Sequence, residues 1–420
     1  MKKSLLFFAL VLASYGTIQA QVTTSSMTGV VTQNSGSVTV GATIKATHTP
    51  TGTLYSSSAN DSGRFNLANM RVGGPYRIEV TYVGKDPIVY NDVYIQLGQP
   101  FILNPVFEES VGTTLDEITV VGKKSGQEKT GASTVIGKEQ LESMPTLNRS
   151  LQDFTRLTPQ ATGSNSFGGA NNRYNNITID GAVNNDVFGL ASSGAPGGQA
   201  NTQPISLDAI QQIQVVLAPY DVTQGNFTGG GVNAVTRSGT NTVEGSIYTF
   251  LRNENTIGKS VFNREKSSQF SDNQFGFRVG GPIVKDKLFF FVNGEIGRRS
   301  APLANNAGEP GSAISLETAQ LIADHTLKTY GYDVGAYGPT DTKTQNNKVF
   351  TKLDWNINDK HSLSVRYNYI DAFDDNISRS SSSFRFGNNA YKFANKQHVA
   401  VAELRSNFSN RFSNNLIVGY

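Results

Sequence analysis

The sequence predicts a mainly β protein built from several domains. Gly is abundant at 42 of 420 residues, with 24 Phe and 16 Tyr. Short β-prone runs alternate with turn-forming Gly, Asn and Ser along most of the chain, which is typical of all-β proteins. After the N-terminal segment no apolar stretch approaches the ~20 residues of a membrane-spanning helix. A membrane location would therefore require a closed β-barrel.

Composition also excludes several kinds of chemistry. The net charge of +3 gives no electrostatic case for nucleic-acid binding. The absence of cysteine excludes disulfides and thiolate chemistry. The four histidines, His48, His325, His361 and His398, never approach metal-ligand spacing. Because no nucleophile–base arrangement is suggested either, we expect no enzyme activity, catalytic residue, metal site or cofactor.

Residues 1–20 have the layout of a secretory signal peptide. Two lysines precede an apolar run from Leu5 to Ala13, and the small residue Ala20 stands before Gln21. A basic start, an apolar middle and a small-residue cleavage site are typical of exported proteins. An N-terminal membrane anchor is the alternative, but the apolar run is short for one.

Residues 22–109 predict a small β-sandwich. Strand-like runs such as "TGVVT", "GATIKATH" and "YRIEVTYV" recur about every ten residues, with turn signals between them. Alternation of Tyr76, Ile78, Val80 and Tyr82 with polar residues fits one buried and one wet face. The order "TGVV…GATIKA…TGT…NDSGRFNL…GGPYRIEVTYVG" resembles the carboxypeptidase regulatory-like domain, a transthyretin-like sandwich. The resemblance implies a non-catalytic structural or docking module, in which we expect His48 to be a solvated loop residue.

Residues 110–130 predict a linker that contains one short strand, "LDEITVVGKK". Ile118 to Val121 are strongly β-prone, but acidic residues precede them and the polar "GKKSGQEKTG" follows. The strand could be the last one of the sandwich or could be left free for another protein. Because "EESVGTT" separates it from the preceding strand, we favour the second interpretation.

Residues 131–239 predict an α+β domain. "IGKEQLESM" and "LNRSLQDFTRLTP" are two short predicted helices separated by Pro145. A strand then closes on the turn dipeptide Asp180-Gly181, and a glycine-rich loop follows. Two further strands, Ile210 to Val216 and Val232 to Thr236, flank Pro219 and the triplet Gly229 to Gly231.

This second domain resembles the plug domain of TonB-dependent outer-membrane receptors. The family pattern has an Ile-rich strand, a Pro turn and a Gly-Gly pair before an Asn/Val/Thr strand. The run "APYDVTQGNFTGGGVNAVTRSGTN" is similar to the Oar-like branch, near the SusC/RagA-like receptors. A regulatory-like sandwich ahead of the plug is the arrangement expected in those branches. The resemblance covers nearly all of the chain after the signal peptide.

Residues 240–420 predict the first part of a transmembrane antiparallel β-barrel. In "KVFTKLDWNI" and the run after the turn "NDKH", apolar residues alternate with polar ones, as in barrel strands. A soluble sandwich would alternate in the same way, but tight turns on one side and long polar excursions on the other favour a barrel. About 180 residues would supply eight or nine of the ~22 strands of a plugged transporter, so we expect a truncated barrel.

The resemblance implies an outer-membrane receptor that imports an external substrate with energy relayed by TonB, ExbB and ExbD. The sandwich and the linker strand would then be periplasmic. The linker strand resembles the TonB box, the segment that pairs with TonB by strand addition. Its residues are Glu117, Ile118, Thr119, Val120 and Val121. Candidate substrate contacts in the plug loops, which could equally be structural turn residues, are Arg173, Asp180, Asn184, Asn185 and Asp186.

Two interpretations from other classes are open. A surface adhesin would need neither plug nor TonB box, and both patterns are present. A signalling receptor would carry a βαβ-type N-terminal domain, whereas residues 28–108 show strands only. SusC-like relatives imply a surface lipoprotein partner, which the Oar-like signature does not. The sequence does not define whether the substrate is a glycan, peptide, protein or metal chelate.

Overall fold

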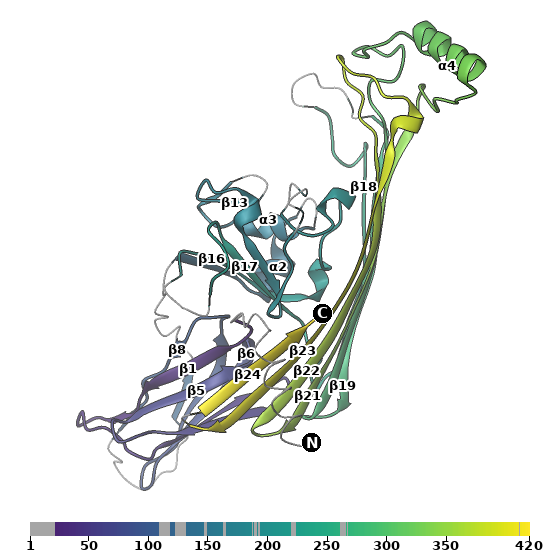
Figure 1. Cartoon of the computed structure of the whole chain (residues 1–420). Helices are drawn as coiled ribbons and strands as arrows, with labels where there is room; N and C mark the ends of the chain where they lie inside the picture. The colour runs from purple at the N-terminus through teal and green to yellow at the C-terminus, as the bar shows by residue number, and fades with distance from the viewer. Residues whose placement is uncertain are drawn as a thin grey trace, which may run out of the picture.

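The computed structural model describes residues 22–108, 118–121, 132–146, 149–162, 165–186, 188, 191, 194–219, 224–260, 266, 268–410 and 412–420. The predicted signal peptide and Glu117 lie outside these residues. The described chain forms a sandwich, a central α+β domain and a long curved sheet, in chain order (Figure 1). None of its helices is both long and apolar enough to span a membrane.

The N-terminal part is a β-sandwich, as predicted. Its main sheets have the orders β10-β7-β6-β3-β4 and β5-β1-β8. Tyr76, Ile78 and Val80 are fully buried in its core, which confirms the predicted alternation. Strand β4 and the two-residue strands β8 and β9 were not among the predicted runs; the β4 sequence "TLYSSS" carries few apolar residues. The strands are β1 (Ser25–Val30), β2 (Thr32–Gln33), β3 (Thr43–His48), β4 (Thr53–Ser58), β5 (Arg64–Met70), β6 (Gly73–Thr81), β7 (Ile88–Ile95), β8 (Phe101–Ile102), β9 (Val106–Phe107) and β10 (Ile118–Val121).

His48 is a buried residue at the end of β3, so the expectation of a solvated loop histidine was wrong. Its side chain is only 6% exposed. The ring lies 4.9 Å from that of Tyr76 between centroids, and Nδ1 lies 2.7 Å from Thr51 Oγ1. Burial, together with the nearby Arg71 guanidinium, lowers the pKa of His48 to about 3.

We expect the sandwich to lose stability as the pH falls from 6.5 toward 3. In this window the unfolded chain binds a proton at position 48 and the folded chain does not, so acid favours unfolding by up to about 1.4 kcal/mol per pH unit. Calorimetry of the protein in detergent at several pH values measures the slope. His48→Gln should reduce it, whereas His325→Gln, on an exposed helix, should not; equal slopes in both variants would contradict the assignment.

The central domain is the predicted mixture of short helices and a five-stranded sheet of order β11-β16-β17-β14-β15. Both predicted helices form but are shorter than their patterns. Asp180 and Gly181 both have positive φ, 43° and 75°, and make the predicted two-residue turn between paired strands. The elements are β11 (Ala132–Ile136), α2 (Lys138–Ser143), α3 (Leu151–Thr155), β12 (Ala161–Thr162), β13 (Ser166–Phe167), η2 (Asn172–Tyr174), β14 (Asn176–Ile179), β15 (Ala182–Val183), η3 (Gly198–Ala200), η4 (Leu207–Ala209), β16 (Ile210–Leu217) and β17 (Gly231–Thr236).

The C-terminal part is a single antiparallel sheet whose strands follow chain order from β18 to β24. It has seven strands among the described residues, fewer than the eight or nine expected, because individual strands reach 19 residues. Helix α4 lies at the tip of the long β20–β21 excursion (Figure 1). The elements are β18 (Glu244–Asn253), β19 (Ser271–Val284), β20 (Leu288–Pro302), α4 (Leu316–Tyr330), β21 (Asp341–Asn358), β22 (His361–Asn376), η5 (Gly387–Asn389), β23 (Tyr391–Ser409) and β24 (Phe412–Gly419).

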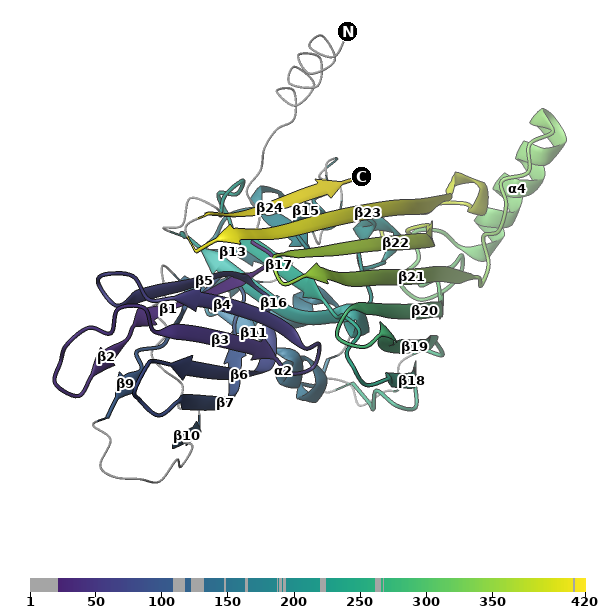
Figure 2. The same ribbon diagram turned by 90° about the horizontal axis from the view of Figure 1, so that it is seen from below.

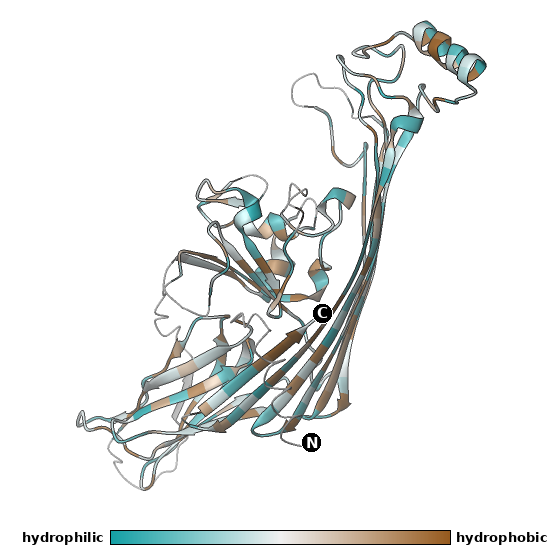
Figure 3. Cartoon of the chain, viewed as in Figure 1, coloured by the Kyte–Doolittle hydropathy of each residue, from teal (hydrophilic) through white to brown (hydrophobic). Residues whose placement is uncertain are grey.

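The two faces of this sheet differ in character. Polar and apolar residues alternate along its strands (Figure 3). On β21, Lys352 and Asp354 are buried on the concave side, whereas Leu353 and Trp355 are exposed on the other. The predicted alternation is thus confirmed, with an apolar outer face and a polar inner one, as in barrels that surround a polar interior.

The central domain lies against the concave face, and the sandwich lies beneath it, at the end of the sheet opposite α4 (Figure 1). Strand β10 runs parallel to β7 at the edge of the sandwich (Figure 2), with Ile118 opposite Ile88 and Val121 opposite Asn91. The expectation that this strand is separate from the sandwich was therefore wrong, because its backbone pairs with β7. Parallel addition to the edge of β7 satisfies those backbone groups of β10 that face β7.

Candidate functional site

The concave face of the curved sheet carries buried polar side chains in rows that cross neighbouring strands. Strand register places Lys352 opposite Arg366 and Asp354 opposite Ser364, while Glu295 lies opposite Lys348. Charged residues are almost never buried unless they are paired. The residues that pair with these buried charges therefore show how the central domain is attached to the sheet.

Asp180 connects the central domain to two cations of the sheet. The β14–β15 turn presents its carboxylate, which accepts hydrogen bonds from the Thr236 amide at 2.8 Å and the Thr236 hydroxyl at 2.5 Å. Arg366 Nε lies 3.0 Å and Lys352 Nζ 3.9 Å from Asp180 Oδ2, and Arg366 also donates to the Ile179 carbonyl. Burial would raise the pKa of Asp180, but the two cations and Thr236 outweigh it and hold the pKa below its usual range.

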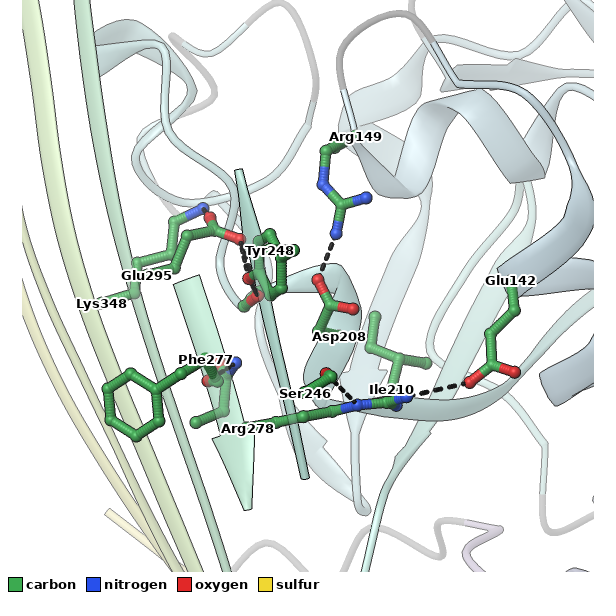
Figure 4. Close-up of polar contacts among 12 residues, drawn as sticks. Glu142, Arg149, Asp208, Ile210, Ser246, Tyr248, Phe277, Arg278, Glu295 and Lys348 are labelled. Atoms are coloured by element: carbon green, nitrogen blue, oxygen red, sulfur yellow. Dashed lines mark hydrogen bonds and ion pairs between the residues drawn. The ribbon is translucent and has the colours of Figure 1, made fainter. Parts of the chain in front are cut away.

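Glu295 of β20 is the centre of a second buried group (Figure 4). Lys348 Nζ lies 2.8 Å from Oε1. The hydroxyls of Ser206, from the central domain, and Tyr248, from β18, donate to Oε2 at 2.8 and 3.0 Å. Glu295 is only 3% exposed, so this carboxylate is satisfied by a cation and two hydroxyls at once.

Three further ion pairs lie beside β18 and β19 (Figure 4). Glu142 of α2 accepts from Arg237 at 2.9 Å and from Arg278 of β19 at 3.2 Å. These two arginines outweigh partial burial and lower the pKa of Glu142. Arg149 pairs with Asp208, and its guanidinium lies over two aromatic rings of β18, Tyr248 and Phe250.

Apolar contacts accompany these charges. Phe291 and Phe350 of the curved sheet belong to the same buried hydrophobic cluster as the core of the central domain. Ala200 of η3 packs with Ile370 and Ala372 of β22. The central domain is thus seated on the sheet by a shared apolar core and by buried ion pairs together.

Family models match three successive parts of the chain. They are the carboxypeptidase regulatory-like domain over residues 26–108, the TonB-dependent receptor plug domain over 125–232 and an outer membrane beta barrel domain over 235–315. The chain combines a plug domain and part of a barrel of the TonB-dependent receptor type. The central domain is its plug, and the curved sheet is part of its barrel.

Curated relatives are themselves named as TonB-dependent proteins. The TonB-dependent transporter Oar of Myxococcus xanthus is 31% identical over 160 residues, 34% of this chain and 14% of that protein. The probable TonB-dependent siderophore receptor PirA of Acinetobacter baumannii is 29% identical over 205 residues, 44% of this chain and 25% of that protein. The chain thus spans a quarter or less of the length of these two relatives.

Among solved structures, the chain overlaps the outer membrane transporter YddB from Escherichia coli. The sequence identity is 15% and the TM-score 0.48, over 68% of this chain and 38% of that one.

The predicted substrate contacts are not brought together as one open cluster. Asp180 and Asn184 are 6% and 5% exposed, and Asp180 is occupied by the barrel cations, so neither side chain is available to a substrate here. Asn185 accepts from the Ile177 amide at 2.7 Å, and Asp186 accepts from the Ala191 amide at 2.6 Å. Arg173 is exposed on η2. A substrate role for Arg173, Asn185 and Asp186 stays a prediction.

The barrel charges that hold the plug were not among the predicted site residues. Glu295, Lys348, Lys352 and Arg366 lie far from the plug in sequence. A usable signal was present, since each is a charged residue on the polar face of an alternating strand. A fully charged side chain on that face needs a partner, but the partner's identity depends on which strands become neighbours.

Proposed function

We propose that this chain acts as an outer-membrane receptor that binds an external substrate and admits it to the periplasm with energy relayed by TonB, ExbB and ExbD. The observation that carries the proposal is the plug seated on the polar inner face of the barrel through Asp180 and Glu295. A domain held in this way closes the lumen. Passage of a substrate then requires work on the plug.

The segment from Glu117 to Val121 is proposed as the TonB box. Its described part, β10, is a backbone-paired strand at the edge of the sandwich. Strand addition needs main-chain hydrogen bonds and little else. Among the described strands β10 is the outermost of its sheet, so the amides and carbonyls on its side away from β7 are open to strand addition.

We also propose that a signal peptide over residues 1–20 directs export and that residues 22–130 lie in the periplasm. The proposed domain boundaries are at residues 109, 130 and 239. We propose that Arg173, Asn185 and Asp186, in the loops of the plug, face the substrate. PirA is named as a siderophore receptor, which makes metal chelates the first substrate class to screen.

Val120→Pro should abolish binding of the purified periplasmic domain of TonB to the receptor in detergent. Proline removes an amide donor from the pairing strand, so strand addition loses a central hydrogen bond. Surface plasmon resonance measures the effect, and growth on candidate nutrients tests it in cells.

Gln127→Pro is the matched control because it places the same residue in the linker after the segment. It should leave TonB binding unchanged. Binding of the Val120→Pro receptor at the native level would overturn the TonB-box assignment.

A further inference from the structure

The sandwich touches the barrel's inner wall as well as the plug. Asn69 Nδ2 donates to Asn407 Oδ1 of β23 at 3.1 Å. Asn356 of β21 donates to Thr53 Oγ1 at 3.0 Å. Thr23 donates to Glu403 of β23. The sandwich therefore covers the end of the inner wall opposite α4, below the plug (Figures 1 and 2).

A buried ion pair lies in this contact. Arg71 Nη2 is 3.5 Å from Asp354 Oδ1, and the two side chains are 12% and 2% exposed. Asp354 lies in the same cross-strand row as Ser364 and Glu403. The plug uses the next row, with Lys352 and Arg366, so plug and sandwich occupy adjacent levels of one polar wall.

The two attachments differ in kind. The plug shares a buried hydrophobic cluster with Phe291 and Phe350 of the barrel. The cluster of the sandwich contains sandwich residues only. Its contacts with the plug are also polar, since the Leu97 amide donates to Gln212 at 3.3 Å and Gln99 donates to Ser133 at 2.8 Å.

Polar contacts of this kind are typical of interfaces between domains that move relative to each other. When the sandwich leaves, Arg71 returns to water and Asp354 and Glu403 face a lumen that is itself polar. None of the hydrophobic clusters of the described residues joins the sandwich to the plug or the barrel, and no charge is left in a dry environment, so separation avoids the largest penalties of burial. Removal of the plug would open the shared apolar core as well.

We propose that the sandwich is a detachable cover of the barrel's inner wall on the periplasmic side, docked through Arg71–Asp354 and released before the plug moves. The docking surface on the barrel is the cross-strand row that contains Asp354 and Glu403. The sandwich of the same chain binds to it. The periplasmic direction rests on the proposed function, whereas the docking does not. A substrate leaving the lumen would pass only after this cover has undocked.

Thiol labelling can test the two attachments separately, because the chain has no cysteine. Thr23→Cys reports on the sandwich and Ser206→Cys on the plug. Both are hydroxyl-to-thiol changes at sites 4% and 2% exposed, and both hydroxyls bond to a buried barrel carboxylate. Each is labelled with a water-soluble maleimide in the detergent-solubilised protein.

Arg71→Glu should raise the labelling rate of Thr23→Cys by at least about tenfold, because two carboxylates would meet at a buried site. The charge swap Arg71→Glu with Asp354→Arg should restore protection. Ser206→Cys should stay protected in every background. Asn69→Ala with Asn407→Ala, which removes neutral hydrogen bonds only, should raise Thr23→Cys labelling by a smaller factor.

Unchanged Thr23→Cys labelling in both Arg71→Glu and the alanine pair would overturn the proposal. A parallel rise of Ser206→Cys would also overturn it, since plug and sandwich would then loosen as one body. In cells, labelling of Thr23→Cys should be faster with TonB than without it. If the purified variants behave as expected but TonB has no effect, docking stands and the proposed energy coupling fails.

Discussion

Asp180→Asn is expected to destabilise the seating of the plug by about 3 to 5 kcal/mol, the range for breaking one side of a buried ion pair. The substitution keeps the size of the side chain but leaves Lys352 and Arg366 without their carboxylate. Calorimetry of the protein in detergent measures the loss. Faster protease cleavage within the plug should accompany it.

Asp272→Asn is the control for this prediction. Asp272 pairs with Arg252 at 2.7 Å, but the two side chains are 25% and 32% exposed. Ion pairs that keep contact with solvent contribute about 0 to 1 kcal/mol, so this variant should stay much closer to the native protein than Asp180→Asn. Equal losses in the two variants would show that Asp180 does not hold the plug.

Gly239→Ala is expected to cost about 3 kcal/mol, at the upper end for overpacking a close contact. A Cβ at this position would lie 2.3 Å from the Phe290 carbonyl oxygen and 2.7 Å from the Gly281 carbonyl oxygen. Both atoms are backbone of barrel strands and cannot rotate away. The junction between plug and barrel would have to shift, which thermal unfolding in detergent and the yield of folded protein in the outer membrane should reveal.

Gly225→Ala is the control, because it makes the same substitution at a position with free space. A Cβ there meets no atom within 4 Å, so its stability should stay within about 0.5 kcal/mol of the native protein. Native stability of the Gly239→Ala variant would mean that the junction is not closely packed.

The sequence predicted features that depend on near neighbours. Alternation around Ile78 is a property of one strand, because its period of two follows from the pleat. The Asp180-Gly181 turn was predictable for a similar reason, since a two-residue hairpin turn needs left-handed conformations that these residues tolerate. Residue patterns of this length also carried the family resemblance that the comparisons confirmed.

Predictions failed where the outcome depended on distant segments. His48 was expected in solvent because a lone loop histidine is usually solvated, but it lies at the end of β3, where the ring of Tyr76 on a neighbouring strand packs against it. β10 was expected to stand apart, but the edge of β7 pairs with it. The number of barrel strands was overestimated because the strands continue beyond the apolar band and are therefore longer than expected.

The sequence alone therefore determined a mainly β protein with a sandwich, an α+β domain and an alternating sheet. These follow from periodicity and turn chemistry within about ten residues, whereas the plug assignment came from the family resemblance. Only the tertiary structure decided that Asp180 meets Arg366 and that Arg71 meets Asp354. Such pairs join residues far apart in the chain, and each charge could pair with many others. Strand register and burial select one partner, because a buried charge is stable only where the fold supplies its counter-charge.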